Sequence, residues 1–144
     1  MDTTYEQLKL GNQLCFPLYA AARKVVSLYT PHLKALGLTY TQYIALMVLW
    51  EHDGLPVGEL GSHLFLDSGT LTPLLKKLAD RGLLTRDRSK EDERVVCVHL
   101  TEEGWKLREE VKEIPAQVGG CVPLTPEEAQ VLYGLLYKIM DEDN

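Results

Sequence analysis

The chain has 144 residues, 45% of them hydrophobic and 25% charged, which predicts a single globular domain with an ordinary apolar core. It holds no apolar run of membrane-spanning length and no secretion signal, so we expect a cytoplasmic protein with no membrane partner. Its three cysteines and four histidines are scattered, and no phosphate-binding loop occurs, so we expect neither a metal, a cofactor nor an enzyme.

The net charge of −6 is unevenly distributed along the chain. Residues 101–144 carry a net charge of −6, whereas residues 76–90 hold six basic and two acidic side chains. Contact with phosphate depends on the local field, so a basic segment on an acidic body is compatible with DNA binding.

Apolar residues recur at helical spacing over residues 5–29 and predict a long first helix. Pro17 lies inside it, so the helix either kinks at 13–17 or restarts with Pro17 as its first residue. Cys15 lies at this break in both versions. A second, short helical piece is predicted over 30–37.

The next segment predicts a helix-turn-helix. Thr39 opens a largely buried helix with a capping box, and a short helix follows from about Pro56. The helix after it begins beyond Asp67, a candidate N-cap, and ends before Gly82, a candidate left-handed residue. Four leucines form its buried stripe at i, i+3, i+4 and i+7, namely Leu71, Leu74, Leu75 and Leu78.

The face opposite these leucines carries small residues, hydroxyls and lysines, which suits close approach to a nucleic-acid groove. An ordinary solvated helix face explains the same pattern about equally well. Two β-type runs, 83–86 and 95–100, then surround a charged loop and predict a hairpin. A helix-turn-helix followed by a hairpin is a winged helix.

Two further helices are expected near the end of the chain. One runs from Trp105 to about Ile114, where Pro115 interrupts it, and 119–123 reads as a linker. Thr125 then opens the last helix with a strong N-terminal signal. The first and last helices carry more apolar surface than a small winged helix needs, and a second copy of the chain would cover it.

The predicted fold is therefore mainly α with a small β-hairpin wing. Within one 1–144 unit, residues 39–114 form the winged helix-turn-helix. Residues 5–37 and 115–144 form a helical region for homodimerisation.

Two runs, 65–78 and 92–101 with Asp92-Glu93-Arg94 inside it, resemble the MarR family of winged-helix repressors. The runs 12–21, 38–43 and 49–51 are similar to the OhrR branch of that family, which responds to organic hydroperoxides. The resemblance covers roughly residues 8–114, and Pro17 departs from the pattern.

The resemblance implies a homodimer that binds double-stranded DNA at an inverted-repeat operator and represses a peroxide-detoxification gene. It implies that organic hydroperoxide oxidises Cys15, and that Tyr19 and Tyr29 hydrogen-bond to the reactive thiol across the dimer. In some members a second cysteine of the partner subunit resolves the sulfenic acid, and Cys121 lies in about that region.

The residues themselves leave alternatives open. A lone cysteine on an apolar helix is more often a small core residue, although Tyr19 lies one turn from Cys15 on the same face. A helix restart at Pro17 would also point free N–H groups toward that sulfur. Cys121, between glycines and Val122, is either a resolving thiol or an incidental linker residue.

The expected DNA contacts divide into three groups. The second helix of the helix-turn-helix would enter the major groove, and its contacts are Ser68, Thr70, Thr72 and Lys76. Arg86 and Arg88, at the root of the hairpin, would meet phosphate. Arg94 is either a minor-groove arginine or the partner of Asp92 that stiffens the wing.

These observations favour a redox-sensing repressor released from its operator when Cys15 is oxidised. The first alternative is a MarR-type regulator released by a small phenolic or lipophilic ligand. The second is a thiol peroxidase that uses this fold.

Overall fold

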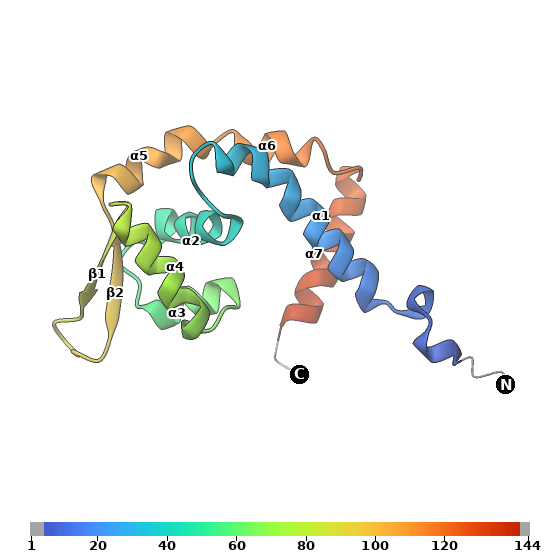
Figure 1. Cartoon of the computed structure of the whole chain (residues 1–144), viewed down its shortest axis with the longest axis horizontal. Coiled ribbons are helices and arrows are strands. Elements are labelled where there is room, and N and C mark those ends of the chain that lie inside the picture. Colours follow the sequence, from blue (N-terminus) through green and yellow to red (C-terminus); the bar gives the residue numbers. More distant parts are fainter. Residues whose placement is uncertain (1–4, 142–144) are drawn as a thin grey trace.

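The computed structural model describes residues 5–141 (Figure 1). Two single-turn 3-10 helices, Glu6–Leu8 and Leu10–Asn12, precede the first α-helix. The elements that follow are α1 (Cys15–Lys34), α2 (Tyr40–Glu51), α3 (Val57–Leu64), α4 (Ser68–Asp80), β1 (Leu84–Arg88), β2 (Val96–Leu100), α5 (Glu102–Val111), α6 (Ile114–Gly119) and α7 (Pro126–Met140).

The chain divides into a body, made of α2 to α5 with the β1–β2 hairpin, and terminal arms, made of α1, α6 and α7. Figure 1 shows the arms extending away from the body on the side opposite the hairpin. The core lies mostly in the body, where α2, α3 and α4 pack together and β2 covers α2 and α3. This arrangement confirms the predicted winged helix, mainly α with a small hairpin.

The first helix begins later than the apolar pattern predicts. The expected helix over residues 5–29 is replaced by the two short turns, and α1 starts at Cys15, so Pro17 is its third residue rather than its first. In a helix that ran through residue 13, the carbonyl of that residue would need an amide hydrogen that Pro17 lacks, and the ring of Pro17 would clash with the same carbonyl. Within the first helical turn neither demand arises.

The separate helical piece expected over 30–37 is also wrong. α1 continues through Pro31 to Lys34, losing one backbone hydrogen bond, because Leu33 is fully buried against the body at that end. Gly37 then adopts a φ of +69° and turns the chain toward α2.

The predicted capping residues of α2 and α4 are confirmed. Thr39 and Gln42 form the capping box of α2, and Asp67 accepts a 2.7 Å hydrogen bond from the amide of Thr70. The four leucines of the α4 stripe are buried, and Gly82 has a φ of +75° just beyond the end of α4. The N-cap, the buried leucines and the turn at Gly82 fix the position of α4 within the body.

The hairpin is one antiparallel pair in which Arg86 lies opposite Val98. The body holds it at the middle and at the last residue of β2. The carbonyl of Leu55 accepts a hydrogen bond from the amide of Val98, and the carboxylate of Asp53 accepts one from the amide of Leu100 at 2.7 Å. A loop over 89–95 joins the strands, and we call the hairpin with this loop the wing.

Close contacts at its first turn fix α5 to the rest of the body. Trp50 donates its indole N–H to the carbonyl of Gly104 at 3.0 Å, and a Cβ at Gly104 would overlap the carbonyl oxygen of Leu83. The guanidinium of Arg108 lies 4.7 Å from the centre of the Trp105 ring on the outer side.

The chain turns between α5 and α6 at residues 112–113, so the break comes before Pro115 rather than at it. Pro115 occupies the first turn of α6, where its missing amide hydrogen costs nothing. Residues 120–125 link α6 to α7, so the linker predicted over 119–123 begins one residue later and extends to the capping residue, and the expected capping box of Thr125 with Glu128 opens α7.

The terminal arms contribute little to the core. Leu33 is the buried residue of α1, and no residue of α7 is buried. α6 packs on α1 and contributes Ile114 and Val118 to the core. The predicted domain covers residues 1–144, of which residues 1–4 and 142–144 lie outside the residues that the structure describes. Within the described residues no helix is long and apolar enough to cross a membrane.

Candidate DNA-binding groove and thiol site

A groove of about 540 Å³ opens between the start of α3, the first half of α4 and the wing. We call it the wing groove. Its lining comes from three segments, namely Pro56 to Glu59, then Ser68, Thr72 and Leu75, then Arg86 and Arg94 to Val96. Three elements that are separate in sequence thus face one concave surface.

Four of the predicted DNA contacts meet in this groove. Ser68 and Thr72 lie one turn apart on α4, and the hydroxyl of Thr72 donates to the carbonyl of Ser68 at 2.8 Å. Arg86 enters from β1 and Arg94 from the wing loop. The side chain of Arg86 has no hydrogen-bond or ion-pair partner among the described residues, so its charge is available to a ligand.

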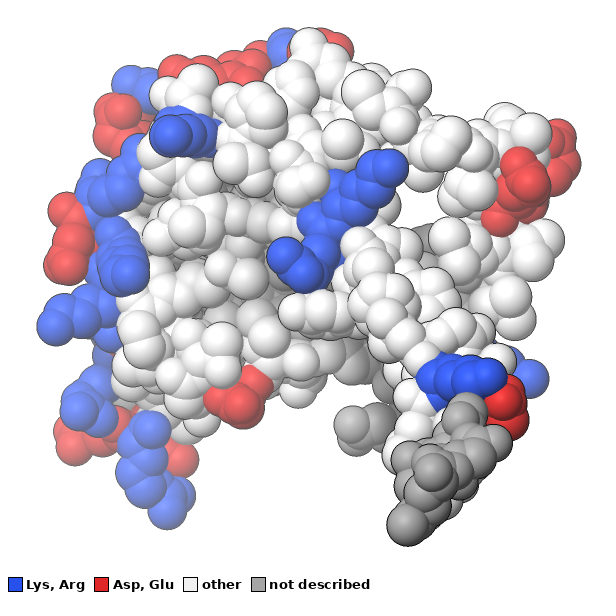
Figure 2. Space-filling model, turned by 45° about the vertical axis from the view of Figure 1, so that its right-hand side comes forward, with Lys and Arg blue, Asp and Glu red and all other residues white. Residues whose placement is uncertain are grey.

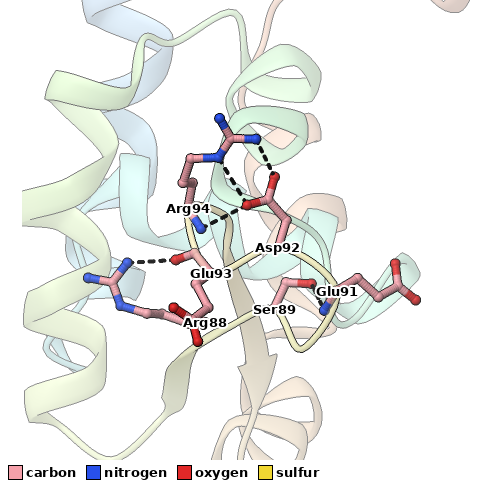
Figure 3. A network of polar contacts seen from close by, with 6 residues as sticks. All are labelled: Arg88, Ser89, Glu91, Asp92, Glu93 and Arg94. Carbon is pink, nitrogen blue, oxygen red and sulfur yellow. Dashed lines mark hydrogen bonds and ion pairs between the residues drawn. The ribbon is translucent and has the colours of Figure 1, made fainter.

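The other three predicted contacts lie outside the groove. Thr70 and Lys76 are exposed on α4. Arg88 is not at the root of the hairpin but at the far end of β1, because the strand is longer than predicted. There its guanidinium donates to the carbonyl of Glu93 at 2.8 Å and helps to close the wing loop (Figure 3).

Asp92 and Arg94 are joined by three hydrogen bonds in the wing loop (Figure 3). One carboxylate oxygen of Asp92 accepts bonds from the backbone amide of Arg94 at 3.0 Å and from its Nε at 3.1 Å, and the other accepts from Nη2 at 3.2 Å. These bonds hold the pKa of Asp92 below its usual range. The predicted pairing with Asp92 is therefore present, and Arg94 also lines the wing groove, whereas its role in the minor groove stays a prediction.

Figure 2 shows Lys and Arg side chains along the edge of the molecule that carries the wing, with Asp and Glu between them, beside a face that is mostly uncharged except for a group of basic side chains near its centre. The uncharged face continues onto the terminal arms. Although the net charge of the chain is −6, two arginines, Arg86 and Arg94, line the wing groove.

Cys15 is the first residue of α1, and its side chain is exposed. Leu14, at the N-cap, offers no side-chain acceptor to the amides of the first turn, and Pro17 carries no amide hydrogen. The amides of Cys15 and Phe16 therefore lack a side-chain cap.

The two predicted tyrosines lie in different places. Tyr19 is one turn after Cys15 and 61% exposed. Tyr29 is about 21 Å farther along the helix than Cys15 at 1.5 Å per residue. Its ring packs on Tyr40 and Tyr43, with centroids 5.0 and 5.7 Å away. One chain therefore does not bring Tyr29 to the thiol.

Burial, with a smaller contribution from Tyr29, raises the pKa of Tyr40 and of Tyr43 above the ordinary tyrosine value. Their hydroxyls stay protonated at neutral pH and can donate hydrogen bonds. The cluster packs the middle of α1 against the start of α2.

Cys121 is exposed at the turn that follows α6, and its thiol donates to the carbonyl of Gln117 at 3.5 Å. It is a free thiol, as are Cys15 and Cys97. Cys97, on β2, is partly buried.

Sequence reasoning missed two features of the site. The first turn of α3 forms one wall of the wing groove, and only its place before α4 could have indicated this. Arg81 belongs to the basic segment of the sequence, yet its guanidinium donates to the carbonyls of Leu36 and Gly37. No local signal reveals a contact across more than 40 residues.

Comparisons with known proteins agree with this geometry. The family described as transcriptional regulator SarA/Rot matches residues 27–111. The organic hydroperoxide resistance transcriptional regulator of Bacillus subtilis is 45% identical over 141 residues, which cover 98% of this chain and 96% of that protein.

Solved structures of AbfR, a protein of Staphylococcus epidermidis, are similar throughout. Its reduced, DNA-bound form is 36% identical, covers 94% of each chain and gives a TM-score of 0.78. Its disulfide form is 37% identical, covers 94% of this chain and 92% of that one, and gives 0.64. The chain therefore belongs to the winged-helix transcriptional regulators of the MarR and SarA/Rot type, in the branch of the organic hydroperoxide resistance regulators.

Proposed function

We propose that this chain is a homodimeric repressor that leaves its operator when organic hydroperoxide oxidises Cys15. One observation carries the proposal: an exposed thiol at the uncapped start of α1, in a DNA-binding regulator 45% identical to an organic hydroperoxide resistance regulator. The wing groove supplies the DNA-binding surface, and α1 belongs to the arm that a partner would cover.

The chemistry at Cys15 is a two-electron oxidation by the hydroperoxide. The thiolate sulfur attacks one peroxide oxygen, a sulfur–oxygen bond forms, the oxygen–oxygen bond breaks, and the alkoxide leaves as the alcohol after taking a proton. The product is a sulfenic acid. The hydroxyl of Tyr19, one helical turn away, is our candidate hydrogen-bond donor to this sulfur.

A second thiol then resolves the sulfenic acid. Its sulfur attacks that of Cys15, a disulfide forms and water leaves. The partner's Cys121 is our candidate, because Cys121 is exposed and follows two glycines that allow the turn to move. Non-reducing gels test this step: a dimer band that Cys121→Ser abolishes supports it, and a monomer with consumed Cys15 assigns the step to a small thiol.

The dimer is proposed from the apolar surface of the arms. Large hydrophobic side chains are exposed along α1 and α7, among them Leu14, Leu18, Leu132 and Leu135. A surface of this extent marks an interface. A second copy would also bring the partner's Tyr29 within reach of Cys15, which one chain does not do.

In the complex we propose that α4 enters the major groove of an inverted-repeat operator, with half-sites about one helical turn apart. Ser68, Thr70 and Thr72 would face base edges or the backbone from its first turns. The remaining proposed contacts are with phosphate or the minor groove, from Lys76, Arg86, Arg88 and Arg94.

The deciding experiment is a gel shift on the DNA upstream of the protein's own gene, with and without cumene hydroperoxide. We expect the wild type to lose binding on oxidation and Cys15→Ser to bind equally well in both conditions. Cys97→Ser is the matched control, and it should behave as the wild type. If Cys15→Ser is still released, the thiol is not the switch and a ligand-released regulator becomes the better interpretation.

The same variants separate a sensor from a peroxidase. A sensor consumes about one hydroperoxide per thiol, because the oxidised form persists until it is reduced. With excess dithiothreitol, sustained turnover of many equivalents would instead assign a catalytic role to Cys15.

A further inference from the structure

We propose that Arg81 is a positioning residue that fixes α4 to the end of α1 and so sets the spacing between the two α4 helices of a dimer. This inference rests on the proposed function, in which α4 binds DNA and α1 belongs to the dimer region. It assigns a role to a basic residue that does not line the wing groove.

The contact of Arg81 joins two elements that are far apart in sequence. Its Nη1 donates to the carbonyl of Gly37 at 2.7 Å, and its Nη2 donates to the carbonyl of Leu36 at 2.9 Å. Both carbonyls lie just beyond the last turn of α1, where the helix dipole is negative, so the cation is also favoured electrostatically. A planar guanidinium can bond two such acceptors at once, which a lysine ammonium does less well.

The chain at residue 37 is shaped to receive the guanidinium. Gly37 has a φ of +69°, and a Cβ there would lie 3.3 Å from Nη1 of Arg81. Any other residue would be strained in this conformation and would crowd the contact. The missing side chain of Gly37 therefore leaves the space that the guanidinium of Arg81 occupies.

The start of α5, which leads to the other arm, meets the same short segment. The hydroxyl of Thr101 donates to the carbonyl of Gly82 at 2.6 Å, and its amide donates to the carbonyl of Leu83 at 3.1 Å. Thr101 is the N-cap of α5, which leads to α6 and α7. Residues 81–83 thus hold the end of α1 and the start of α5, and Figure 1 shows α4, the hairpin and α5 meeting at this corner.

A direct phosphate contact explains Arg81 less well. It lies six residues after Leu75, the last residue of α4 in the wing groove, which is about 9 Å farther along the helix axis. Two of its N–H groups are already directed at α1. Its contribution should therefore be to geometry rather than to charge.

The test measures spacing discrimination with the full-length reduced protein. The probe is a duplex that the reduced wild type enriches from a random library, together with the same duplex carrying one inserted base pair at its centre. A rigid dimer should bind the inserted duplex more weakly. We expect Arg81→Ala and Arg81→Lys each to reduce this discrimination by about tenfold, a typical size for coupling between sites.

Lys77→Ala is the matched control, because Lys77 is an exposed cation one turn earlier on α4 without a side-chain partner among the described residues. It should keep the discrimination of the wild type. The salt dependence of binding should be the same for Arg81→Ala as for the wild type, because no phosphate contact is lost.

Three results would overturn the proposal. Unchanged discrimination in Arg81→Ala, even with a lower melting temperature, would make the contact merely structural. A salt slope lower by about one, with rescue by Arg81→Lys, would make Arg81 a phosphate ligand. A wild type that enriches no inverted repeat would remove the proposed function and this inference with it, and that outcome is visible before any variant is tested.

Discussion

The basic side chains of the α4–wing segment have different tasks, although the sequence presents them as one cluster. Arg81 binds the end of α1, Arg88 closes the wing loop and Arg94 pairs with Asp92. Arg86 remains without a partner inside the wing groove. Local net charge therefore overstates the charge available to DNA, and Arg86 is the strongest candidate for a phosphate contact.

Arg86→Ala should weaken operator binding across sequences and lower the salt slope by about one, because one phosphate contact is lost. Fluorescence anisotropy at several salt concentrations measures both effects. Arg108→Ala is the control, since Arg108 lies over Trp105 on α5. An equal change in both variants would show that total charge, and not the groove, determines binding.

Residue-scale prediction succeeded where a role depends on nearby sequence. The leucine stripe and the caps at Asp67 and Thr39 were all predicted, because helical spacing and capping are local rules. Tyr29 and Arg81 show the limit. Their contacts join segments 11 to 45 residues apart, so only the folded chain shows that Tyr29 packs on Tyr40 and that Arg81 binds the carbonyl of Leu36.

At the scale of elements, different interactions determine where α1 and α5 begin. α1 begins where Pro17 allows it, and its first half contributes no buried side chain within one chain. α5 begins where Thr101 caps it and Gly104 permits contact with Leu83. Sequence patterns predicted that both helices exist and misplaced the start of α1, because amphipathic spacing over 5–14 continues without any core behind it.

Gly104→Ala should destabilise the protein by about 1–3 kcal/mol, because the new methyl group overlaps the carbonyl of Leu83 and forces α5 to shift. Urea denaturation at one fixed protein concentration measures the change. Gly58→Ala is the matched control: it is a helical glycine with nothing within 4 Å of the added Cβ, so stability should be unchanged or up to about 1 kcal/mol higher. Equal losses in both variants would contradict the close contact.

At the scale of the whole molecule, the body is a complete unit and the arms are not. α7 buries none of its residues, and a groove of about 350 Å³ along it is lined by Val131, Leu132 and Leu135 with two glutamates. The apolar residues at helical spacing in the first and last helices predicted this excess of apolar surface. It could not predict the arrangement of the arms, because the partner that would order them is a second chain.

Leu132→Glu should convert the proposed dimer to a monomer, because the change places a charge on the apolar face of α7. Operator affinity should then fall by about 100-fold or more, since one half-site is bound without its neighbour. Sedimentation velocity and anisotropy measure the two effects. Gln130→Glu adds the same charge on the opposite face of α7 and should leave both unchanged; a dimeric Leu132→Glu protein would show that α7 is not in the interface.

The positions of the tryptophans and tyrosines give the molecule two separate intrinsic fluorescence signals. Both tryptophans belong to the body, Trp50 bonded to Gly104 and Trp105 beneath Arg108, whereas five of the seven tyrosines precede α2 or lie on α7. Tryptophan emission therefore follows the DNA-binding body, and tyrosine emission follows mainly the arms. Oxidation that moves the arms around an intact body would change the second signal and leave the first nearly constant, without any attached dye.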